Sequence, residues 1–353
     1  MGRTKGSFAA EVVHWQASHG RNDLPWQNTQ DPYRVWLSEI MLQQTQVVTV
    51  REYFARFLSR CPDVQALAAA SLDDVLGLWS GLGYYTRARN LHRCAQQVVA
   101  EFGGQFPRSA ELLRTLPGIG RSTAAAISSL CFGERVAILD ANVKRVVTRV
   151  QGFDADLAKA ANERRLWDVA TALIPTAAEA KDAQAMQRYT QGMMDLGATV
   201  CLPKKPLCLV CPVRPECVAA AQGQPEKYPV RTRTLKRSSQ SIWLLWAHRK
   251  DAAVWLSKRP TPGVWAGLYC LPLMDSEEAL SAALPPKLQA AVTILPVVVH
   301  VLTHKDLYLH PRAVEFPENA SVDDSGQWFL PAQWRTAGLP APIRKLLEQA
   351  AAI

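Results

Sequence analysis

The chain has 353 residues, of which 48% are hydrophobic and 20% are charged, and its formal net charge is +9. At about 100–200 residues per domain this length suggests two or three domains, and the apolar fraction excludes a disordered chain. No run of about 18 apolar residues is present, and the basic start MGRTKGSF has no apolar stretch behind it, which argues against a membrane span and a signal peptide. We therefore expect a cytoplasmic protein that does not contact membranes.

The positive charge is confined to one part of the chain. Residues 239–353 contain ten basic and ten acidic side chains, so the whole +9 belongs to residues 1–238. Such a local excess favours a polyanionic partner, either nucleic acid or anionic lipid, over the alternative that the charge serves solubility alone.

The first half of the chain has helical periodicity, and one helical segment carries a candidate acid. This segment begins near Tyr33 and reads YRVWLSEIMLQQTQVVTV. Glu39 lies within it, and the residues three and four positions away are mostly apolar: Val35, Trp36, Leu42 and Gln43. An apolar setting raises the pKa of a carboxyl group, so Glu39 can hold a proton near neutral pH. The alternative is an ordinary exposed glutamate at the edge of a helix.

Residues 109–133 read SAELLRTLPGIGRSTAAAISSLCFG and predict two helices joined by a tight turn. The first helix is expected to stop at Leu116 and the second to open at Arg121. Gly118 and Gly120 permit positive φ and leave backbone N–H groups uncovered at a helix N-terminus. This helix–hairpin–helix pattern predicts a site that can bind a phosphate without reading any base.

Asp140 follows an apolar run, at the point where a new helix begins. Aspartate is a common N-cap, and the helix dipole at that position favours the ionised carboxylate. A carboxyl group that keeps its proton and another that loses it form a general acid and a stabiliser of positive charge. Glu39 and Asp140 are therefore candidate catalytic residues.

Four of the eight cysteines lie close together, with the spacing C-x6-C-x2-C-x5-C: Cys201, Cys208, Cys211 and Cys217. In a cytosolic chain such a quartet indicates a metal site, and four thiolates suit either tetrahedral zinc or a cubane iron–sulfur cluster. Lys204, Lys205 and Arg214 project from the same loop, where fixed cations suit phosphate oxygens.

Residues 222–238 are polar and basic, contain two prolines and have no periodicity, which predicts an extended linker. Beyond them come short strand-like runs at 241–248, 252–259 and 297–304, and then a helix near residues 341–350. The predicted plan is an all-helical domain followed by a smaller α+β domain.

Together these motifs resemble the endonuclease III, or helix–hairpin–helix, superfamily of DNA glycosylases and, within it, the MutY-type adenine DNA glycosylases. A further segment, residues 258–272, resembles the Nudix-like domain of those enzymes. The matching segments are LPWQ (24–27), WLSEIMLQQTQ (36–46), GLWSGLGYYTRARNLH (77–92), LPGIGRSTA (116–124), ILDANVKRV (138–146) and QGMMDLGATVC (191–201).

The resemblance implies a multi-domain fold. Residues 1–221 would form the helical glycosylase domain, with its helix–hairpin–helix at 109–133 and an iron–sulfur loop at 201–217. Residues 222–238 would be the linker, and residues 239–353 the Nudix-like lesion-recognition domain. It also implies one 4Fe-4S cluster on the four cysteines, and a monomer associated with the nucleoid.

The activity implied is the hydrolysis of the N-glycosidic bond of adenine, flipped out of duplex DNA opposite 8-oxoguanine or guanine. Glu39 would protonate a ring nitrogen of adenine and Asp140 would stabilise the cationic sugar. The implied adenine pocket consists of Trp26, Gln27, Gln191 and Ser122. Core packing is the alternative role for Trp26 and also for Tyr84, an implied wedge residue. The implied DNA contacts are Leu42, Gln44, Tyr84, Gly118, Gly120, Lys204, Lys205, Leu302, Thr303 and His304.

Several positions distinguish this chain from its relatives. Ser122 stands where the bifunctional branch has its lysine nucleophile, so water is the expected nucleophile and Lys144 is not expected to be catalytic. Ala141 replaces a usual glycine, and residues 302–304 read Leu-Thr-His where Phe-Ser-His is typical. The glutamate-rich Nudix hydrolase signature is missing, so the second domain is expected to contact DNA and hydrolyse nothing. The alternatives are a bifunctional glycosylase/lyase and a non-enzymatic iron–sulfur DNA-binding protein.

Overall fold

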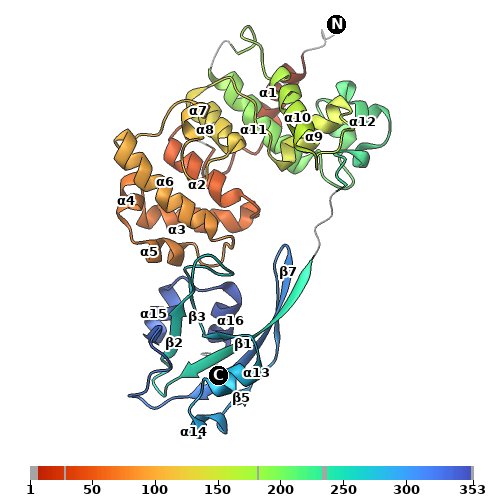
Figure 1. Cartoon of the computed structure of the whole chain (residues 1–353). Coiled ribbons are helices and arrows are strands. Elements are labelled where there is room, and N and C mark those ends of the chain that lie inside the picture. The colour runs from red at the N-terminus through yellow and green to blue at the C-terminus, as the bar shows by residue number, and fades with distance from the viewer. Residues whose placement is uncertain (1–6, 28, 181–182, 233–236, 351–353) are drawn as a thin grey trace. The chain divides into compact units, whose positions relative to one another are not determined.

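The computed structural model describes residues 7–27, 29–180, 183–232 and 237–350, and in these ranges it is helical up to the linker and mixed beyond it (Figure 1). The helices of the first part are α1 (Phe8–His19), α2 (Pro32–Leu42), α3 (Val47–Arg60), α4 (Val64–Ala69), α5 (Leu72–Leu78), α6 (Thr86–Phe102), α7 (Ala110–Leu113), α8 (Arg121–Phe132), α9 (Ala141–Gln151), α10 (Ala160–Ala172), α11 (Ala183–Thr199) and α12 (Val218–Ala221), with the short 3-10 helices η1 (Cys208–Val210), η2 (Arg214–Glu216) and η3 (Pro225–Lys227). This pattern confirms the predicted all-α part followed by an α+β part. No helix in the described ranges is both long enough and apolar enough to cross a bilayer.

The second part contains the strands β1 (Ser238–His248), β2 (Val254–Lys258), β3 (Tyr269–Cys270), β4 (Leu273–Met274), β5 (Thr293–Ile294), β6 (Val298–Val301), β7 (Lys305–Glu315) and β8 (Gly326–Phe329), and the helices α13 (Glu277–Ala282), α14 (Pro286–Gln289), α15 (Pro331–Thr336) and α16 (Ala341–Ala350). The two long strands β1 and β7 pair in parallel, and β2 and β4 pair with β1 antiparallel. β5 and β6 in turn pair antiparallel with β7, and β3 and β8 with β2.

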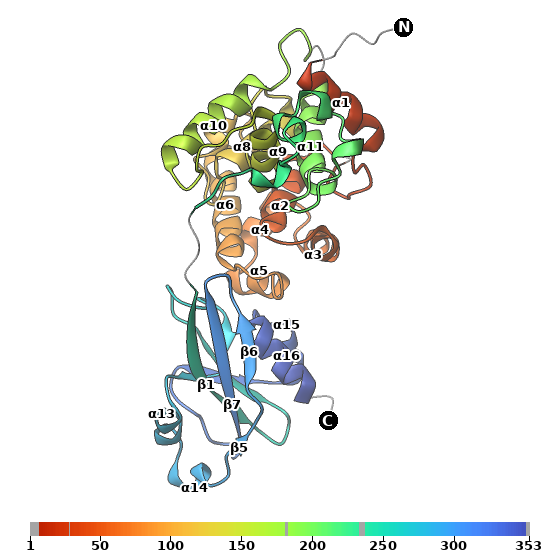
Figure 2. The same ribbon diagram turned by 90° about the vertical axis from the view of Figure 1, so that its right-hand side faces the viewer.

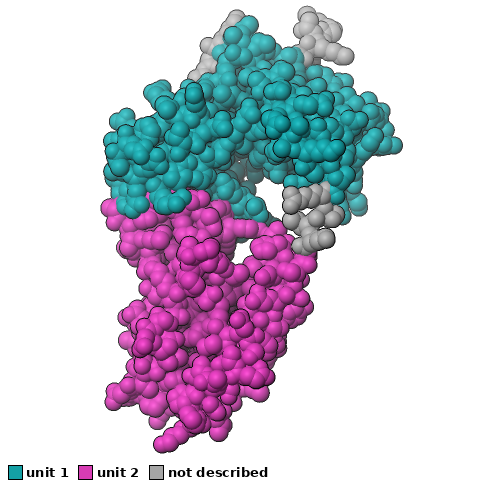
Figure 3. Space-filling model, viewed as in Figure 1, with its two compact units in different colours: residues 1–54, 62–68, 93–233 teal, residues 55–61, 69–92, 234–353 magenta. Residues whose placement is uncertain are grey.

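The chain forms two compact units, which Figure 3 distinguishes by colour. Unit 1 consists of residues 1–54, 62–68 and 93–233, and unit 2 of residues 55–61, 69–92 and 234–353. Unit 2 therefore contains two stretches of the helical half as well as the sheet. Residues 233–236 of the predicted linker lie outside the described residues, and the predicted domain borders stay predictions.

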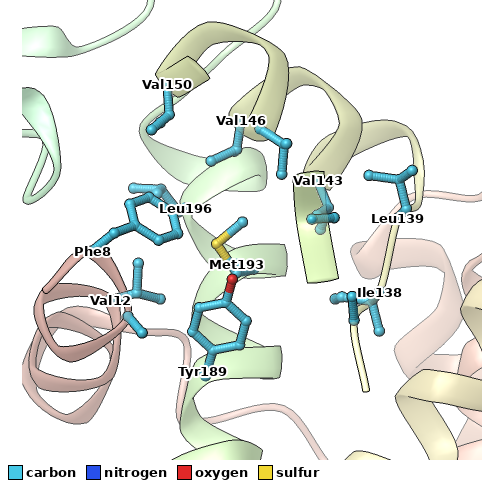
Figure 4. Close-up of a cluster of buried hydrophobic side chains, with 14 of the residues drawn as sticks. Phe8, Val12, Ile138, Leu139, Val143, Val146, Val150, Tyr189, Met193 and Leu196 are labelled. Atoms are coloured by element: carbon cyan, nitrogen blue, oxygen red, sulfur yellow. The ribbon is translucent and has the colours of Figure 1, made fainter. Parts of the chain in front are cut away.

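The core of unit 1 is built around α11. Tyr189, Met193 and Leu196 lie on one face of this helix, one turn apart, and are buried with Phe8 of α1 and Val146 of α9 (Figure 4). This spacing is that of an amphipathic helix, whose apolar stripe is buried on both of its neighbours. α11 thereby fixes the positions of α1 and α9 relative to each other.

The helix that was predicted to run on from Tyr33 is interrupted. Asp31 caps the N-terminus of α2, and its carboxylate accepts the Tyr33 N–H at 2.9 Å. The helix ends at Leu42, and α3 starts only at Val47. In the intervening turn Gln44 has a φ of +58°, which is unfavourable for an L-residue. Tertiary packing therefore overrides the local helical preference of these residues. The turn changes the direction of the chain shortly after Glu39.

The sheet of unit 2 buries both of its faces, and Figure 2 shows α15 and α16 lying beside it. Alternate residues of β1 point to opposite faces, as the pleat requires. Ile242 and Leu244 join the cluster that includes Ile343 of α16, whereas Leu245 joins the cluster that includes Leu280 of α13. Helices on both sides thus complete two apolar layers.

Residues 69–92 are tied to the chain after β8 by specific hydrogen bonds within unit 2. The Ser80 hydroxyl donates to the Leu339 carbonyl at 3.0 Å, and the Tyr85 hydroxyl donates to the same carbonyl at 2.9 Å. The Arg344 guanidinium donates to Ser80 Oγ at 3.1 Å, and Lys258 forms an ion pair with Asp73 at 2.5 Å. These contacts hold α5 and the following turn on the sheet-containing part of the chain.

Candidate active site

A cavity of about 700 Å³ in unit 1 holds both candidate catalytic carboxyl groups. Glu39 reaches it from α2, and Asp140 reaches it from the start of α9. The chain between α1 and α2, the turn after α2 and the helices α8 and α11 also contribute to the wall. Residues separated by about one hundred positions in the sequence therefore face the same space.

The setting of Glu39 agrees with the prediction from its neighbours. Burial and, as a smaller cause, the charge of Asp140 together raise the pKa of Glu39 to about 7. An apolar environment and a like charge both disfavour ionisation. Glu39 is thus a carboxyl group that can carry a proton near neutral pH.

Asp140 only partly agrees with the prediction. It is the N-cap of α9, as expected, and its Oδ1 accepts the Val143 N–H at 2.7 Å. Its pKa is nevertheless raised, because burial outweighs the backbone hydrogen bonds from Val143 and Asn142 and the charge of Arg145. The cap hydrogen bonds favour the ionised carboxylate, as expected, but burial has the larger effect because the side chain loses more hydration than the cap restores.

The four predicted adenine-pocket residues all lie in unit 1, and three of them line the cavity of Glu39. Trp26 is only 6% exposed and packs edge-on against Phe54, with ring centroids 5.3 Å apart. Ser122 Oγ accepts the Leu139 N–H at 3.0 Å. The residues that line the cavity of Glu39 are Trp26, Ser122 and Gln191.

A second cavity of about 450 Å³ shares Trp26, Gln191 and two apolar residues with the first. Gln27 lines this second cavity. Its Oε1 accepts the Leu24 N–H at 3.3 Å, whereas its Nε2 is buried without a partner among the described residues. A buried donor without a partner is costly, so this atom is suited to an acceptor on a bound ligand.

The predicted DNA contacts of unit 1 fall in three places. Leu42 and Gln44 border the cavity of Glu39 on the turn after α2. Gly118, with a φ of +77°, and Gly120, the N-cap of α8, form the hairpin, although α7 ends at Leu113 rather than at Leu116. Lys204 and Lys205 are exposed on the cysteine loop.

The remaining predicted DNA contacts belong to unit 2, where they line a cavity of about 650 Å³. Tyr84, which has a φ of +48°, is 46% exposed, so the alternative of plain core packing does not hold for it. Its hydroxyl lies 2.5 Å from Thr303 Oγ1, and Leu302 and His304 line the same cavity. The structure therefore brings the predicted wedge residue and the predicted lesion loop together.

The four cysteines line one small apolar cavity beside α9 and α11. Within the described ranges no group of three or more His, Cys, Asp or Glu side chains has the arrangement of a single metal ion's ligands. Arg149 is only 2% exposed and donates to Cys201 Sγ at 3.4 Å and to the Leu202 carbonyl at 2.6 Å. Four thiols facing one cavity, with a buried guanidinium beside them, fit an anionic all-sulfur ligand set.

Similarity to known proteins decides the family. Residues 37–171 match the HhH-GPD superfamily of base excision DNA repair proteins, and residues 242–349 match the NUDIX domain. The chain is 35% identical over 350 residues to the adenine DNA glycosylase of Buchnera aphidicola from Acyrthosiphon pisum, covering 98% of each protein. It is 32% identical to the human adenine DNA glycosylase, covering 97% of this chain and 73% of the human protein. The chain belongs to the adenine DNA glycosylase family.

A solved structure described as a thermostable thymine-DNA glycosylase is also similar, with a TM-score of 0.53 and 27% identity, covering 61% of this chain and 95% of that one. The predicted identity, enzyme class and DNA substrate are thereby confirmed. The enzyme is a DNA glycosylase that removes adenine in base excision repair.

Two residues of this glycosylase site were not predicted from the sequence. Asp195 has a side chain that is 0% exposed, and Arg21 forms an ion pair with it at 2.8 Å. The signal was an aspartate within the apolar stretch QGMMDLGATVC, because a buried carboxyl group needs a partner. Its partner lies 174 positions earlier, so the sequence did not identify the pair.

Proposed function

We propose that this glycosylase hydrolyses the N-glycosidic bond of adenine mispaired with 8-oxoguanine or guanine in duplex DNA, without a lysine nucleophile. The observation that carries the proposal is the shared cavity of Glu39 and Asp140, in which the pKa of Glu39 is raised to about 7. An enzyme cannot reach a base inside the stack, so the adenine must be extruded into this cavity at a cost of about a few kcal/mol.

Glu39 acts first, as the general acid. Adenine leaves poorly as an anion, and a proton delivered to N7 makes it a neutral leaving group. A carboxyl group with a pKa near the working pH suits this role, because it is protonated at rest and still acidic enough to give the proton up.

Asp140 stabilises the sugar as the bond breaks. The sugar becomes oxocarbenium-like, and a carboxylate held in place by the Val143 N–H offers a fixed negative charge to it, either directly or through a transient adduct.

The adenine itself is held by Trp26, Gln27, Gln191 and Ser122. Trp26 supplies a flat apolar wall, and the unpartnered Gln27 Nε2 supplies a donor. Gln191 lies on the boundary between the two cavities, where it can contact the edge of a purine.

The absence of a lysine nucleophile is supported by two side chains. Ser122 occupies the position of the nucleophile in bifunctional relatives, and its Oγ is engaged by the Leu139 N–H. Lys144 is not among the residues that line the cavity, and its ammonium group forms an ion pair with Glu163. Water is then the nucleophile that completes the hydrolysis.

The DNA is held by contacts of two kinds. The hairpin glycines Gly118 and Gly120, with Lys204 and Lys205, would contact phosphates. Gln44 and Tyr84 would wedge into the stack with Leu42, and the lesion loop of Leu302, Thr303 and His304 would contact 8-oxoguanine.

One 4Fe-4S cluster, held by Cys201, Cys208, Cys211 and Cys217, would fix the loop that carries these lysines. The cluster supplies a rigid thiolate-ligated centre, and Arg149 offsets part of its negative charge. We further propose that the enzyme acts as a monomer, and that its DNA substrate places it at the nucleoid in the cytoplasm.

Incubation with an A:8-oxoguanine duplex, followed by alkali, tests the function. We expect free adenine and a strand break that appears only after alkali. A break without alkali would identify a bifunctional glycosylase/lyase, and a duplex left intact even after alkali would identify a non-enzymatic DNA-binding protein. A brown protein that contains iron and sulfide is expected, and a colourless zinc protein would refute the cluster.

A further inference from the structure

Asp195 lies beneath the adenine-pocket residue Gln191, one turn further along α11. Its carboxylate accepts three hydrogen bonds: from the Gln191 side chain at 2.9 Å, from the Arg21 backbone at 3.0 Å and from Arg21 Nε at 2.8 Å. Arg21 Nη2 also forms an ion pair with it at 2.8 Å. The Asp195 side chain is 0% exposed, so no water competes for these bonds. The Asp195 carboxylate is therefore a buried hydrogen-bond acceptor that lies next to the adenine-pocket residue Gln191.

These bonds determine which way the Gln191 amide points. Both oxygens of Asp195 accept from Arg21, so the group facing Gln191 is an acceptor, and only the amide Nε2 can donate to it. The carbonyl Oε1 of Gln191 is left for the cavity side. Within the described part of the chain no residue donates a hydrogen bond to this Oε1, and Gln191 lines both cavities.

We propose that Asp195 is a positioning residue which, by holding one N–H of the Gln191 amide, directs the carbonyl oxygen toward the base and thereby favours a purine with an amino group at position 6. This inference rests on the proposed function. Adenine carries the N6 amino donor beside the N7 acceptor. An amide free to rotate could present either its nitrogen or its oxygen to N6, but here a half-turn of the amide would place its oxygen against the Asp195 carboxylate.

Two residues would then each contact a different group on the same edge of adenine. Gln191 Oε1 accepts from the N6 amino group, and N7 remains free for the proton of Glu39, which lines the same cavity. A base with a carbonyl at position 6 would instead face the Gln191 oxygen with its own oxygen. Such a pair of acceptors leaves both unsatisfied, which an enclosed site penalises strongly.

The backbone around Asp195 is packed tightly enough to keep this geometry. A Cβ built on Gly192 would lie 2.8 Å from a Val12 methyl group of α1, and a Cβ on Gly20 would lie 2.7 Å from the Gln16 carbonyl and 3.0 Å from Asp195 itself. α1 and α11 therefore approach each other closely on either side of the Arg21–Asp195 pair. This close approach holds Arg21 and Asp195 in contact.

The test compares two duplexes that differ only in the base opposite 8-oxoguanine, adenine in one and hypoxanthine in the other. Hypoxanthine has a carbonyl at position 6. We expect Asp195→Asn, whose amide can donate as well as accept, to lower the adenine-to-hypoxanthine ratio of single-turnover rates by about tenfold, the scale of one hydrogen bond in a buried site. A variant that is slower on both duplexes but keeps the wild-type ratio would overturn the proposal and leave Asp195 a purely structural role.

A double-mutant cycle shows whether the effect passes through Gln191. Gln191→Ala should lower the ratio by itself, and adding Asp195→Asn to it should lower the ratio no further. A further drop in the double variant would contradict a role through Gln191.

Should Asp195→Asn fail to fold, Arg21→Met provides the second test. It leaves a buried carboxyl group without its cation, which takes up a proton and can then donate to Gln191 Oε1. The ratio should again fall, and an unchanged ratio would refute the proposal. Wild-type enzyme that releases no adenine at all would refute the proposed function instead, so the two failures can be told apart.

Discussion

At the scale of single residues, the chemistry rests on two carboxyl groups in one cavity. Glu39 holds its proton because its surroundings are apolar and because Asp140 lies near it. The sequence indicated the first cause through the residues three and four positions away, but not the second, since the pair meets only through the packing of α2 against α8 and of α9 against α11. Asp195 and Arg21 were missed for the same reason.

Replacing Glu39 tests the acid. We expect Glu39→Gln to slow adenine release by about 10²–10⁴-fold, because the amide has no proton to give, while duplex binding persists. The measurement is single-turnover cleavage on an A:8-oxoguanine duplex beside a binding titration. Glu52→Gln, a change on the exposed side of α3, is the matched control and should cleave like wild type. Wild-type rates in Glu39→Gln would remove Glu39 from the mechanism.

The pH dependence follows from the same residue. The single-turnover rate should fall as the pH rises through about 7, where Glu39 loses its proton. The folded state also binds this proton more tightly than the unfolded chain, whose glutamates titrate near 4.5. The stability that this proton contributes is complete below 4.5 and is lost as the pH rises through about 7.

Urea unfolding at several pH values checks this second consequence. Glu39→Gln has no group that titrates at this position. Its free energy of unfolding should therefore rise relative to that of wild type as the pH increases from 4.5 to about 7. Glu52→Gln should run parallel to wild type. A constant difference between Glu39→Gln and wild type would show that the pKa of Glu39 is not raised.

At the scale of elements, two helix N-termini carry residues with proposed roles in catalysis or DNA binding. α9 begins at Asp140, which caps it, and α8 begins at Gly120, which has no side chain with which to cap it. The sequence predicted both starts well, because N-caps and Pro-Gly turns are local signals. It did not predict the turn between α2 and α3, because a helical pattern runs through residues 43–46 and only tertiary packing interrupts it.

Substitutions at Asp140 separate its two roles. Asparagine is as good an N-cap as aspartate, so Asp140→Asn should change the free energy of unfolding little but slow adenine release by about 10²–10³-fold through loss of charge. Asp140→Ala should additionally cost about 0.5–2 kcal/mol of stability. Ser71→Ala, which removes the cap of α5, is the control that loses stability without losing chemistry. An Asn variant impaired only in DNA affinity would assign Asp140 to capping alone.

The two hairpin glycines should behave differently. Gly118 has a φ of +77°, so Gly118→Ala should cost about 1–2 kcal/mol of stability, as an L-residue does in the left-handed region. Gly120 has ordinary φ and open space around its missing Cβ. Gly120→Ala should therefore fold normally, but its methyl group would stand before the N-terminus of α8 and weaken DNA binding. Thermal melts and binding titrations distinguish the two, and unchanged DNA binding by Gly120→Ala would argue against phosphate contact there.

At the scale of the whole molecule, the sequence predicted the order of the parts and the uneven charge. It did not predict the parallel pairing of β1 with β7 from Ser238–Lys305 to His248–Glu315, because strands more than sixty residues apart carry no local signal of their register. Nor did it assign residues 69–92 to unit 2, since their helical pattern resembles that of their neighbours.

The charge distribution predicts a strong dependence of DNA binding on salt. With Lys204 and Lys205 both changed to alanine, the slope of log K against log salt should become shallower by about 0.9 for each phosphate that is no longer neutralised. Lys287→Ala, an exposed change in the electrically balanced residues 239–353, should leave the slope unchanged. An unchanged slope in the double alanine variant would remove the cysteine loop from the DNA interface.

The hydrogen bonds of Ser80 and Tyr85 with Leu339 and Arg344 limit how relatives of this enzyme can exchange parts. A chimera that takes only the residues after the linker from another species would separate these bonding partners, which come from two distant stretches of the chain. The segment that can be exchanged between species is therefore discontinuous. Residues 69–92 must be exchanged together with the C-terminal sheet if the chimera is to retain these hydrogen bonds.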